Sequence, residues 1–294
     1  MSASTHQGGR HGWTAWQVGT MAVLAIAAIW ACLPAWRDIY LIATQKQDFG
    51  YILLAPLVAG YLFWIRRSRM RFIRCRPSLA GPLLVAIGFA LTWFGDERDV
   101  HLARHLGALV ALTGAVVTMT GLEVFRQFGS VFLALLFLLP VPGTIRQRVS
   151  RPLQWSAAEF TVSFLELIGV AAIREGAVIR IKDVPVAVGE ACDGMRMVFA
   201  LVLVVFAFVF SVPLRPGTRL LLIALSPVVA LICNVLRLVP TSLVYGFADP
   251  DTAKTAHDIA GWLMLPAALV MLLGIVRLMR WLDLPVFRWR LLAT

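Results

Sequence analysis

Apolar runs separated by short polar segments make up most of this chain of 294 residues. Most runs are close to the ~20 residues with which an α-helix crosses a bilayer. They predict an all-α polytopic membrane protein with about eight transmembrane helices, at residues 13–36, 51–65, 79–94, 106–122, 128–142, 197–212, 220–239 and 259–278. The fifth run ends at Pro140-Val141-Pro142, where proline stops the helix.

Residues 143–176 do not fit this pattern of spans. Their first part places apolar and basic side chains on different faces, as in a helix that lies in the membrane interface: Ile145, Val149 and Leu153 against Arg146, Arg148 and Arg151. Their second part, residues 157–173, is apolar but carries Glu159 and Glu166. We therefore expect an interfacial or partly re-entrant helix, with a full span as the alternative.

Alternation of apolar and polar residues marks the next segment. Ile179-Arg180-Ile181-Lys182 alternates, Lys182-Asp183 is typical of a turn, and residues 184–188 are typical of extended chain. A small hairpin is therefore expected just before residue 190, on the same face of the membrane as that residue.

Composition supports the membrane assignment. The chain is 60% hydrophobic and 15% charged, with a mean hydropathy of +0.81, which excludes a soluble globular protein. We expect one integral-membrane domain over residues 1–294, in which the polar residues 1–12 form a disordered N-terminus. The first run is long and no small-residue cleavage site follows it, so we expect no cleavable signal peptide.

The positive charge indicates a membrane topology. A net charge of +11 could indicate a nucleic-acid partner, but the arginines cluster between apolar runs, six of them within residues 66–76. Anionic membrane lipids and the positive-inside rule explain this distribution better, so we expect no nucleic acid. The loops on the N-terminal side carry 14 lysines and arginines, and the short loops opposite carry five. Both termini are therefore predicted to be cytoplasmic, which places residues 190–196 at the outer face.

Cysteine and histidine spacing gives no sign of a metal centre or a cofactor. No CxxC pair occurs among the four cysteines, so neither a zinc site nor a disulfide framework is expected from Cys32, Cys75, Cys192 and Cys233. His101 and His105 lie four residues apart beside an acidic loop and could form a metal pair. Solvated loop residues are the interpretation that we favour for them.

A charged segment at the start of the sixth span is the first candidate site. It contains Glu190, Cys192, Asp193, Gly194 and Arg196. Charge at the edge of a membrane segment is costly and usually functional. Asp193 is predicted to cap the following helix, which places Cys192 where the helix dipole and unpaired N–H groups favour a thiolate. A buried structural cysteine beside a helix cap is the alternative.

Two further segments complete the candidate site. Arg237, three residues after Asn234, lies near the outer end of the seventh span, and His257-Asp258 precedes the eighth. Because consecutive spans alternate in direction, the thiol, the guanidinium and the imidazole are expected on one membrane face. Together they could act as nucleophile, oxyanion donor and proton-transfer group. Taken singly, Arg237 could instead snorkel to the interface and His257 could be a capped loop residue. Arg196 is the alternative oxyanion donor.

These segments resemble the motifs of the exosortase/archaeosortase family of membrane cysteine transpeptidase-like enzymes: Glu190-Ala-Cys192-Asp-Gly194-Met-Arg196, Asn234-Val-Leu-Arg237 and His257-Asp-Ile-Ala-Gly261. The resemblance covers most of the chain, since three earlier segments also fit: Pro140-Val-Pro142, Pro152-Leu-Gln154 and Gly176-Ala-Val-Ile179. Two positions depart from the family pattern. Asp193 replaces the usual serine, and Asp48-Phe49-Gly50 stands where many bacterial members have His-Gly.

The resemblance implies a protein-sorting enzyme of the bacterial inner membrane. Cys192 would be the nucleophile and Arg237 and His257 would complete a triad, supported by Glu190, Asp193, Gly194, Arg196, Asn234 and Asp258. The substrates would be exported proteins with a C-terminal tail made of a Pro-Glu-Pro-like motif, a transmembrane helix and a basic cluster. Cleavage through a thioester would release the protein to water or to another acceptor. The two departures leave the subgroup, and therefore the recognised motif, open.

Three other functions remain as alternatives. A transporter would line a pathway with charged residues such as Arg237 and Glu190, but it is expected to show inverted repeats, and none is visible. An intramembrane serine protease would carry Gly-x-Ser-Gly within a span, which this sequence lacks. An assembly component of exopolysaccharide export would differ from the enzyme only in needing no reactive thiol.

Overall fold

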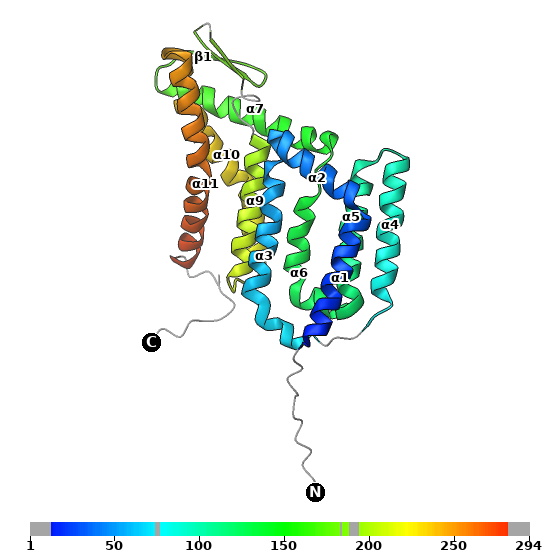
Figure 1. Cartoon of the computed structure of the whole chain (residues 1–294). Helices are drawn as coiled ribbons and strands as arrows, with labels where there is room; N and C mark the ends of the chain where they lie inside the picture. The colour runs from blue at the N-terminus through cyan, green and yellow to red at the C-terminus, as the bar shows by residue number, and fades with distance from the viewer. Residues whose placement is uncertain (1–12, 74–76, 183, 188–193, 282–294) are drawn as a thin grey trace. The chain divides into compact units, whose positions relative to one another are not determined.

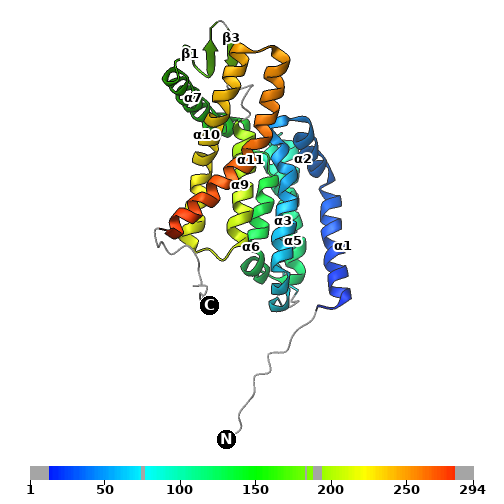
Figure 2. The ribbon, with the colours of Figure 1, turned by 90° about the vertical axis from the view of Figure 1, so that its left-hand side faces the viewer.

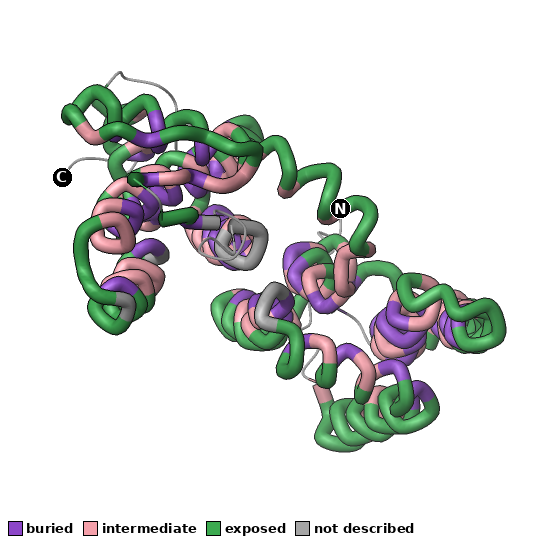
Figure 3. Tube along the Cα trace, turned by 90° about the horizontal axis from the view of Figure 1, so that it is seen from above, coloured by how far each residue is buried: buried purple, intermediate pink, exposed green. Residues whose placement is uncertain are grey.

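Helices dominate the computed structural model, which describes residues 13–73, 77–182, 184–187 and 194–281 (Figure 1). This confirms the predicted all-α polytopic class. The chain forms two compact units. Unit 1 contains Met1–Gln45 and Ala55–Pro140, and unit 2 contains Lys46–Leu54 and Val141–Thr294. Within each unit, buried residues lie on the faces that the helices turn toward one another (Figure 3). The prediction of a single domain over residues 1–294 stays a prediction.

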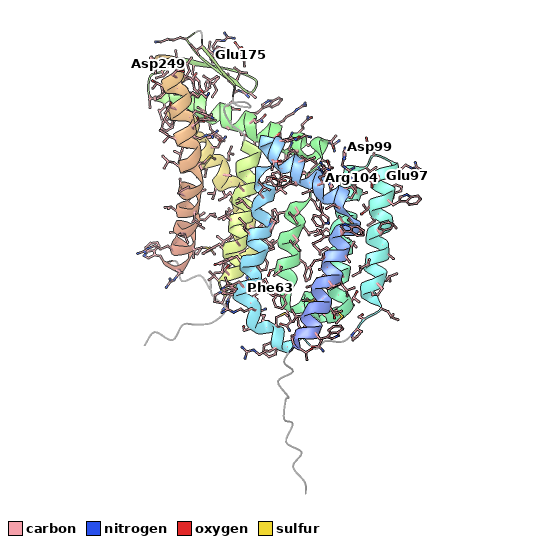
Figure 4. All side chains as sticks on the ribbon, in the orientation of Figure 1. Phe63, Glu97, Asp99, Arg104, Glu175 and Asp249 are labelled. Carbon is pink, nitrogen blue, oxygen red and sulfur yellow. The ribbon has the colours of Figure 1, made fainter. Side chains whose placement is uncertain are left out.

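Unit 1 is a bundle built around one central helix. Its elements are α1 (Ala15–Ala31), α2 (Leu33–Gln45), α3 (Leu54–Arg66), the 3₁₀ helix η2 (Arg67–Phe72), α4 (Ala80–Glu97), α5 (His101–Thr120), α6 (Glu123–Leu135) and η3 (Leu136–Leu138). The central helix α5 packs against α1, α2, α4 and α6. In addition, α3 contacts α6 through the Phe63 and Phe128 rings, whose centroids are 5.3 Å apart; Figure 4 labels Phe63. As predicted, the helix of the fifth run ends before Pro140.

The first span is shorter than the apolar run predicts. The chain bends by 74° between α1 and α2, at Cys32. Pro34 explains the break, because proline cannot donate the backbone bond that would continue α1 and is well tolerated in the first turn of a new helix. Residues 37–45, expected as part of a short polar loop, are therefore helical, and this expectation was wrong.

Small residues bring α4 and α5 into close contact. Gly81, Gly88 and Gly95 recur every seven residues on α4, and they face α5. A Cβ atom at Gly88 would lie 2.4 Å from the backbone nitrogen of Ala111, far inside van der Waals contact. This close approach matches the way in which membrane helices associate, where small residues let backbones pack tightly in the absence of a hydrophobic driving force.

A partly buried polar cluster joins α2, α4 and α5. The Nε2 atom of His105 lies 2.7 Å from a carboxylate oxygen of Asp38, and Arg104 bonds both Asp38 and Asp96. His105 is 1% exposed, and Figure 4 shows Arg104 near Asp99, which lies in the turn between α4 and α5. The expectation that His101 and His105 are solvated loop residues was wrong, because both belong to α5 and His105 is buried between helices.

Unit 2 combines three long helices, a crosswise helix and a small sheet. Its elements are the 3₁₀ helix η1 (Gln47–Leu53), α7 (Gly143–Leu167), β1 (Ala172–Glu175), β2 (Val178–Ile181), β3 (Val184–Ala187), α9 (Gly194–Ser211), α10 (Pro216–Phe247) and α11 (Pro250–Trp281). Figures 1 and 2 show α7 running crosswise to α9 and α10. Within unit 2, α9, α10 and α11 pack along one another.

The crosswise helix α7 has the surface of an interfacial helix. Apolar Ile145 and Val149 are about half exposed, as are the side chains of Trp155 and Phe160 further along. Glu159 and Glu166 are exposed as well. Apart from the half-buried Arg146, the charged side chains of α7 are exposed, which suits a boundary between lipid and water. The helix ends at Leu167, so the interfacial placement predicted over residues 157–173 concerns a shorter helix than expected.

The predicted hairpin is part of a three-stranded antiparallel sheet. β2 pairs with β3 around the turn at Lys182, as the alternation indicated. β2 also pairs with β1 around Gly176, whose φ of +66° favours glycine. The sheet packs on the end of α10, where Gly246 leaves room for the Ile181 side chain. Strand β1 was missed because Ala172 and Ile173 continue the apolar run of the preceding helix.

Judged by length and composition alone, fewer than the predicted eight spans are found among the described helices. Among the described residues, four helices are long and apolar enough to cross a membrane, or up to six if each of two bent pairs is one span. The described part of α9, Val198–Ser211, is apolar but shorter than a full span. Each of the eight predicted spans nevertheless corresponds to a helix, so the count of eight stays a prediction.

The tight α4–α5 contact predicts that unit 1 tolerates no added methyl group at Gly88. Gly88→Ala should destabilise the protein by about 1–3 kcal/mol, because the new Cβ forces the two backbones apart. Gly60→Ala is the matched control, since nothing lies within 4 Å of a Cβ atom added to that glycine. Thermal unfolding of the purified protein in detergent measures both. Equal melting temperatures for the two variants would contradict this packing.

Candidate functional site

Helix α10 carries Arg237 and Asn234 one turn apart on a buried stretch of the helix. Their exposed fractions are 6% and 7%. The helix continues ten residues beyond Arg237, to Phe247, although the sequence predicted its end near residue 239. Pro240 removes one backbone bond, but the Thr241 hydroxyl donates to the Arg237 carbonyl at 2.8 Å and packing against α7 and the sheet continues the helix. Arg237 is therefore inside α10 rather than at its end.

His257 lies within α11 rather than ahead of it. This helix begins at Pro250, so His257 belongs to its second turn, and its side chain is half-buried. Because α10 and α11 are joined by only Ala248 and Asp249, positions along them can be compared from that turn. At a rise of 1.5 Å per residue, Arg237 lies about 15 Å and His257 about 10 Å from it. The two side chains therefore originate within about one helical turn of the same level.

Helix α9 begins at that level too. It starts at Gly194, as the sequence predicted, and it is joined to α10 by residues 212–215. Gly194 and Asn234 both lie about 26 Å along their helices from this connection, which puts Arg237 one turn further on. Glu190, Cys192 and Asp193 lie outside the described residues, and only the backbone of Arg196 is described.

Walls on two sides shield this part of α10. Leu238, next to Arg237, is fully buried in a cluster with Leu165 of α7 and Ile179 and Ile181 of the sheet. The Nε atom of Arg237 and the Nδ1 atom of His257 are both inaccessible to solvent. Charge interactions in such surroundings are much less screened than at an exposed surface. Asp258, predicted as a supporting residue, is exposed.

The turn between α10 and α11 is held by a side-chain cap. Asp249 accepts hydrogen bonds from the backbone N–H and the hydroxyl of Thr252, at 2.9 and 2.8 Å. These bonds hold the pKa of Asp249 below its ordinary value. At the same end of unit 2 (Figure 4), Arg180 donates two hydrogen bonds to Glu175 and lowers the pKa of that carboxyl. The cap fixes the turn from which the levels of Arg237 and His257 are counted.

The segment before α3 also packs on this region, which the sequence did not predict. Tyr51 of η1 stacks on Phe199 of α9, with ring centroids 4.9 Å apart. Arg146 of α7 lies 5.1 Å from the ring centroid of Phe49. Residues 47–53 were expected as loop followed by the start of the second span. Their aromatic residues, spaced two apart, are the signal that could have shown a packed segment.

Metal-ligating side chains do not gather in the part of unit 2 or unit 1 that the structure describes. No group of three or more histidines, cysteines, aspartates or glutamates there could hold a metal ion. His101 and His105 stack 6.3 Å apart, and His105 uses its Nε2 atom on Asp38 instead.

Comparison with known protein families gives a match that covers most of these helices. The family of transmembrane exosortases (Exosortase_EpsH) matches residues 36–274, from within α2 to within α11. The chain belongs to the transmembrane exosortase family. The matched range contains every segment of the candidate site. No curated protein and no solved structure shows significant similarity to this exosortase chain.

The cap at Asp249 predicts a pH-dependent loss of stability. Asp249→Ala removes the acceptor for Thr252 and should lower the melting temperature at pH 7. Because the folded pKa of Asp249 is depressed, its contribution is present above its ordinary pKa of about 3.9 and is lost as the pH falls through the folded value. Wild type and variant should therefore converge in acid. Asp251→Ala, an exposed acid in the same turn, is the control, and a gap that persists unchanged in acid would refute the cap.

Proposed function

We propose that this chain is a protein-sorting cysteine transpeptidase or protease of the bacterial inner membrane. The observation that carries the proposal is the common level of three helix segments in unit 2: the start of α9, the buried Arg237 of α10 and the half-buried His257 of α11. Cys192 precedes Gly194, the first residue of α9, by two residues in the sequence. Membership in the exosortase family supports the same chemistry.

The first chemical step is attack on a peptide bond. The Cys192 thiolate forms a bond to the scissile carbonyl carbon, and the carbonyl electrons move onto oxygen. Arg237, charged at any physiological pH, donates hydrogen bonds to this oxyanion. As the oxyanion collapses, the C–N bond breaks and His257 donates a proton to the leaving amine. The products are a thioester on Cys192 and the released tail.

The second step frees the enzyme. Water or another nucleophile attacks the thioester while His257, now neutral, accepts its proton. The new bond to the acyl carbon replaces the C–S bond, and the thiolate of Cys192 leaves. Asn234 and Gly194 lie at the level of the attack, and Glu190, Asp193, Arg196 and Asp258 are the remaining supporting candidates.

The family and the charge distribution support one class of substrate. Exported proteins with a C-terminal Pro-Glu-Pro-like motif, a transmembrane helix and a basic cluster would present the motif at the outer face. The loops on the same side of the membrane as the N-terminus carry 14 lysines and arginines, which favours cytoplasmic termini and a site at the outer face. The acceptor is water, a lipid or another nucleophile.

The decisive experiment compares the C-termini of exported proteins by mass spectrometry in cells with the wild-type chain, without the chain and with Cys192→Ala. Tails should be removed only in the wild type, while Cys192→Ala inserts into the membrane at normal levels. Cys233→Ala is the control thiol, since Cys233 is buried against Met271. Complete processing by Cys192→Ala would favour a non-enzymatic transporter or an assembly component of exopolysaccharide export.

The proposed role of Arg237 predicts that tail removal needs the planar guanidinium group of this residue and not only its positive charge. Arg237→Lys should lower the rate of tail removal by about 10²–10³-fold, the usual cost of losing one oxyanion donor. Quantitative immunoblotting of processed substrate over time measures it, with Arg196→Lys as the matched variant. Near-normal turnover in Arg237→Lys together with an inactive Arg196→Lys would transfer the oxyanion role to Arg196.

The role of His257 predicts a block before the thioester forms. An amine leaves poorly unless it is protonated as the C–N bond breaks, so His257→Ala should leave both substrate and Cys192 unmodified. Intact-mass measurement of the variant, purified after co-expression with a tail-bearing substrate, detects any adduct. A trapped, hydroxylamine-sensitive adduct on Cys192 would show that His257 serves only the second step and that another group is the acid.

A further inference from the structure

A small cavity lies between α7, α9 and α10 in unit 2. It has a volume of about 20 Å³, and its walls include Leu153 and Gln154 of α7, Val198 of α9, and Ala230 and Asn234 of α10. The helices leave this space because Ala230, buried to 2% exposure, presents only a methyl group where its neighbours are longer. Leu153, Gln154 and Val198 are only half-buried, so the cavity reaches the surface of the unit.

The cavity adjoins the candidate site along two helices. Asn234, one of its walls, lies one turn before Arg237 on α10. Val198 lies four residues after Gly194, which is about 6 Å along α9. A group that enters the cavity is therefore about one helical turn from the level at which α9 begins and Arg237 lies.

The residues that line the cavity determine which kind of chemical group can bind in it. Most of the exposed wall surface is apolar, and a bound water needs two to four polar partners, so an apolar group gains more from this space. The volume is close to that of one or two water-sized groups, since a single water needs about 10–15 Å³ measured in this way. A lipid acyl chain is far too long to be enclosed here, whereas the side chain of alanine or valine is the right size.

We propose that this cavity is the specificity pocket for a small apolar side chain of the polypeptide substrate, on the residue whose carbonyl Cys192 attacks. This inference rests on the proposed function. Ala230 and Val198 set the size of the pocket, and Asn234 and Gln154 also line it, so their amides are the groups that can bind the peptide backbone of the substrate. The pocket thereby fixes which peptide bond meets the thiol.

Alkylation of Cys192 tests the pocket with defined probes. In N-acetyl-aminoacyl chloromethyl ketones the Cys192 sulfur bonds to the methylene carbon and chloride leaves, while the aminoacyl side chain occupies the place of the residue before the scissile bond. We would measure second-order rates by intact mass on the full chain in detergent, with glycine, alanine, valine and leucine reagents. The alanine and valine reagents should react fastest with the wild type.

Two variants change the pocket from different helices, and one serves as a control. Ala230→Leu fills it and should lower the rate of the valine reagent about 10–100-fold relative to the glycine reagent. Val198→Ala enlarges it and should raise the rate of the leucine reagent relative to the alanine reagent. Ala224→Leu adds the same side chain at an exposed alanine of α10 and should keep the wild-type order.

The outcomes separate the pocket from the proposed function. If Cys192 is labelled but the order of the reagents is the same in wild type, Ala230→Leu and Val198→Ala, the cavity is not the specificity pocket and the cysteine enzyme stands. If no reagent labels Cys192 in the wild type, both proposals fail. A shift toward smaller reagents in Ala230→Leu, together with a shift toward larger ones in Val198→Ala, supports the pocket, because a general disturbance of the fold would not move the two in opposite directions.

Discussion

Burial of a guanidinium inside a helix bundle is the constraint on which unit 2 depends. Arg237 is 6% exposed and lies ten residues before the end of a 32-residue helix. Removing such a charge from water costs several kcal/mol even after the surroundings relax, so polar groups and shielding walls must be supplied around it. The crosswise helix α7 and the sheet on the end of α10 pack against this part of the helix and shield it. A charge retained at such cost in a membrane protein marks function.

In unit 1, small residues determine how closely the helices α4 and α5 pack. Glycines at intervals of seven let α4 and α5 approach until their backbones touch. Asp38 of α2 and Asp96 of α4 both bond side chains of the same central helix, α5. Polar groups that are buried in this way are costly unless they bond one another, and His105 and Arg104 both bond Asp38. Close backbone contact and these polar bonds therefore hold α2, α4 and α5 together, while large apolar side chains such as Phe63 and Phe128 join α3 to α6.

Much of this fold could be predicted from the sequence because long apolar runs identify helices by length alone. The start of α9 after Asp193 and the β2–β3 hairpin also followed from local patterns. The helix ends did not, since Pro240 signals a stop that packing against α7 and the sheet overrides, and Pro34 breaks a run whose hydropathy is continuous. His105 looked like a solvated residue because its partner, Asp38, is distant in sequence. Strand β1 was hidden in an apolar run.

The residues of the candidate site were predicted from the sequence. In the structure, two of the three central residues, Arg237 and His257, originate at nearly the same level, although the sequence misplaced the ends of both helices. Arg237 and His257 are each further inside their helices than expected, and the two errors offset each other because the helices are antiparallel. Asp258 is exposed, and the packing of Tyr51 on α9 could not be foreseen, since it depends on a contact between residues distant in the chain.

The measurement that tests the central claim most directly is the pH dependence of Cys192 alkylation by iodoacetamide in the wild type, Arg237→Leu and His257→Ala. If the guanidinium and the imidazole lie beside the thiol, the alkylation rate of the wild type should have its inflection below the ordinary thiol pKa of about 8.5. In Arg237→Leu that inflection should move to higher pH. In His257→Ala the shape of the rate profile should change near neutral pH. Profiles that coincide in all three proteins would show that Arg237 and His257 do not act on Cys192.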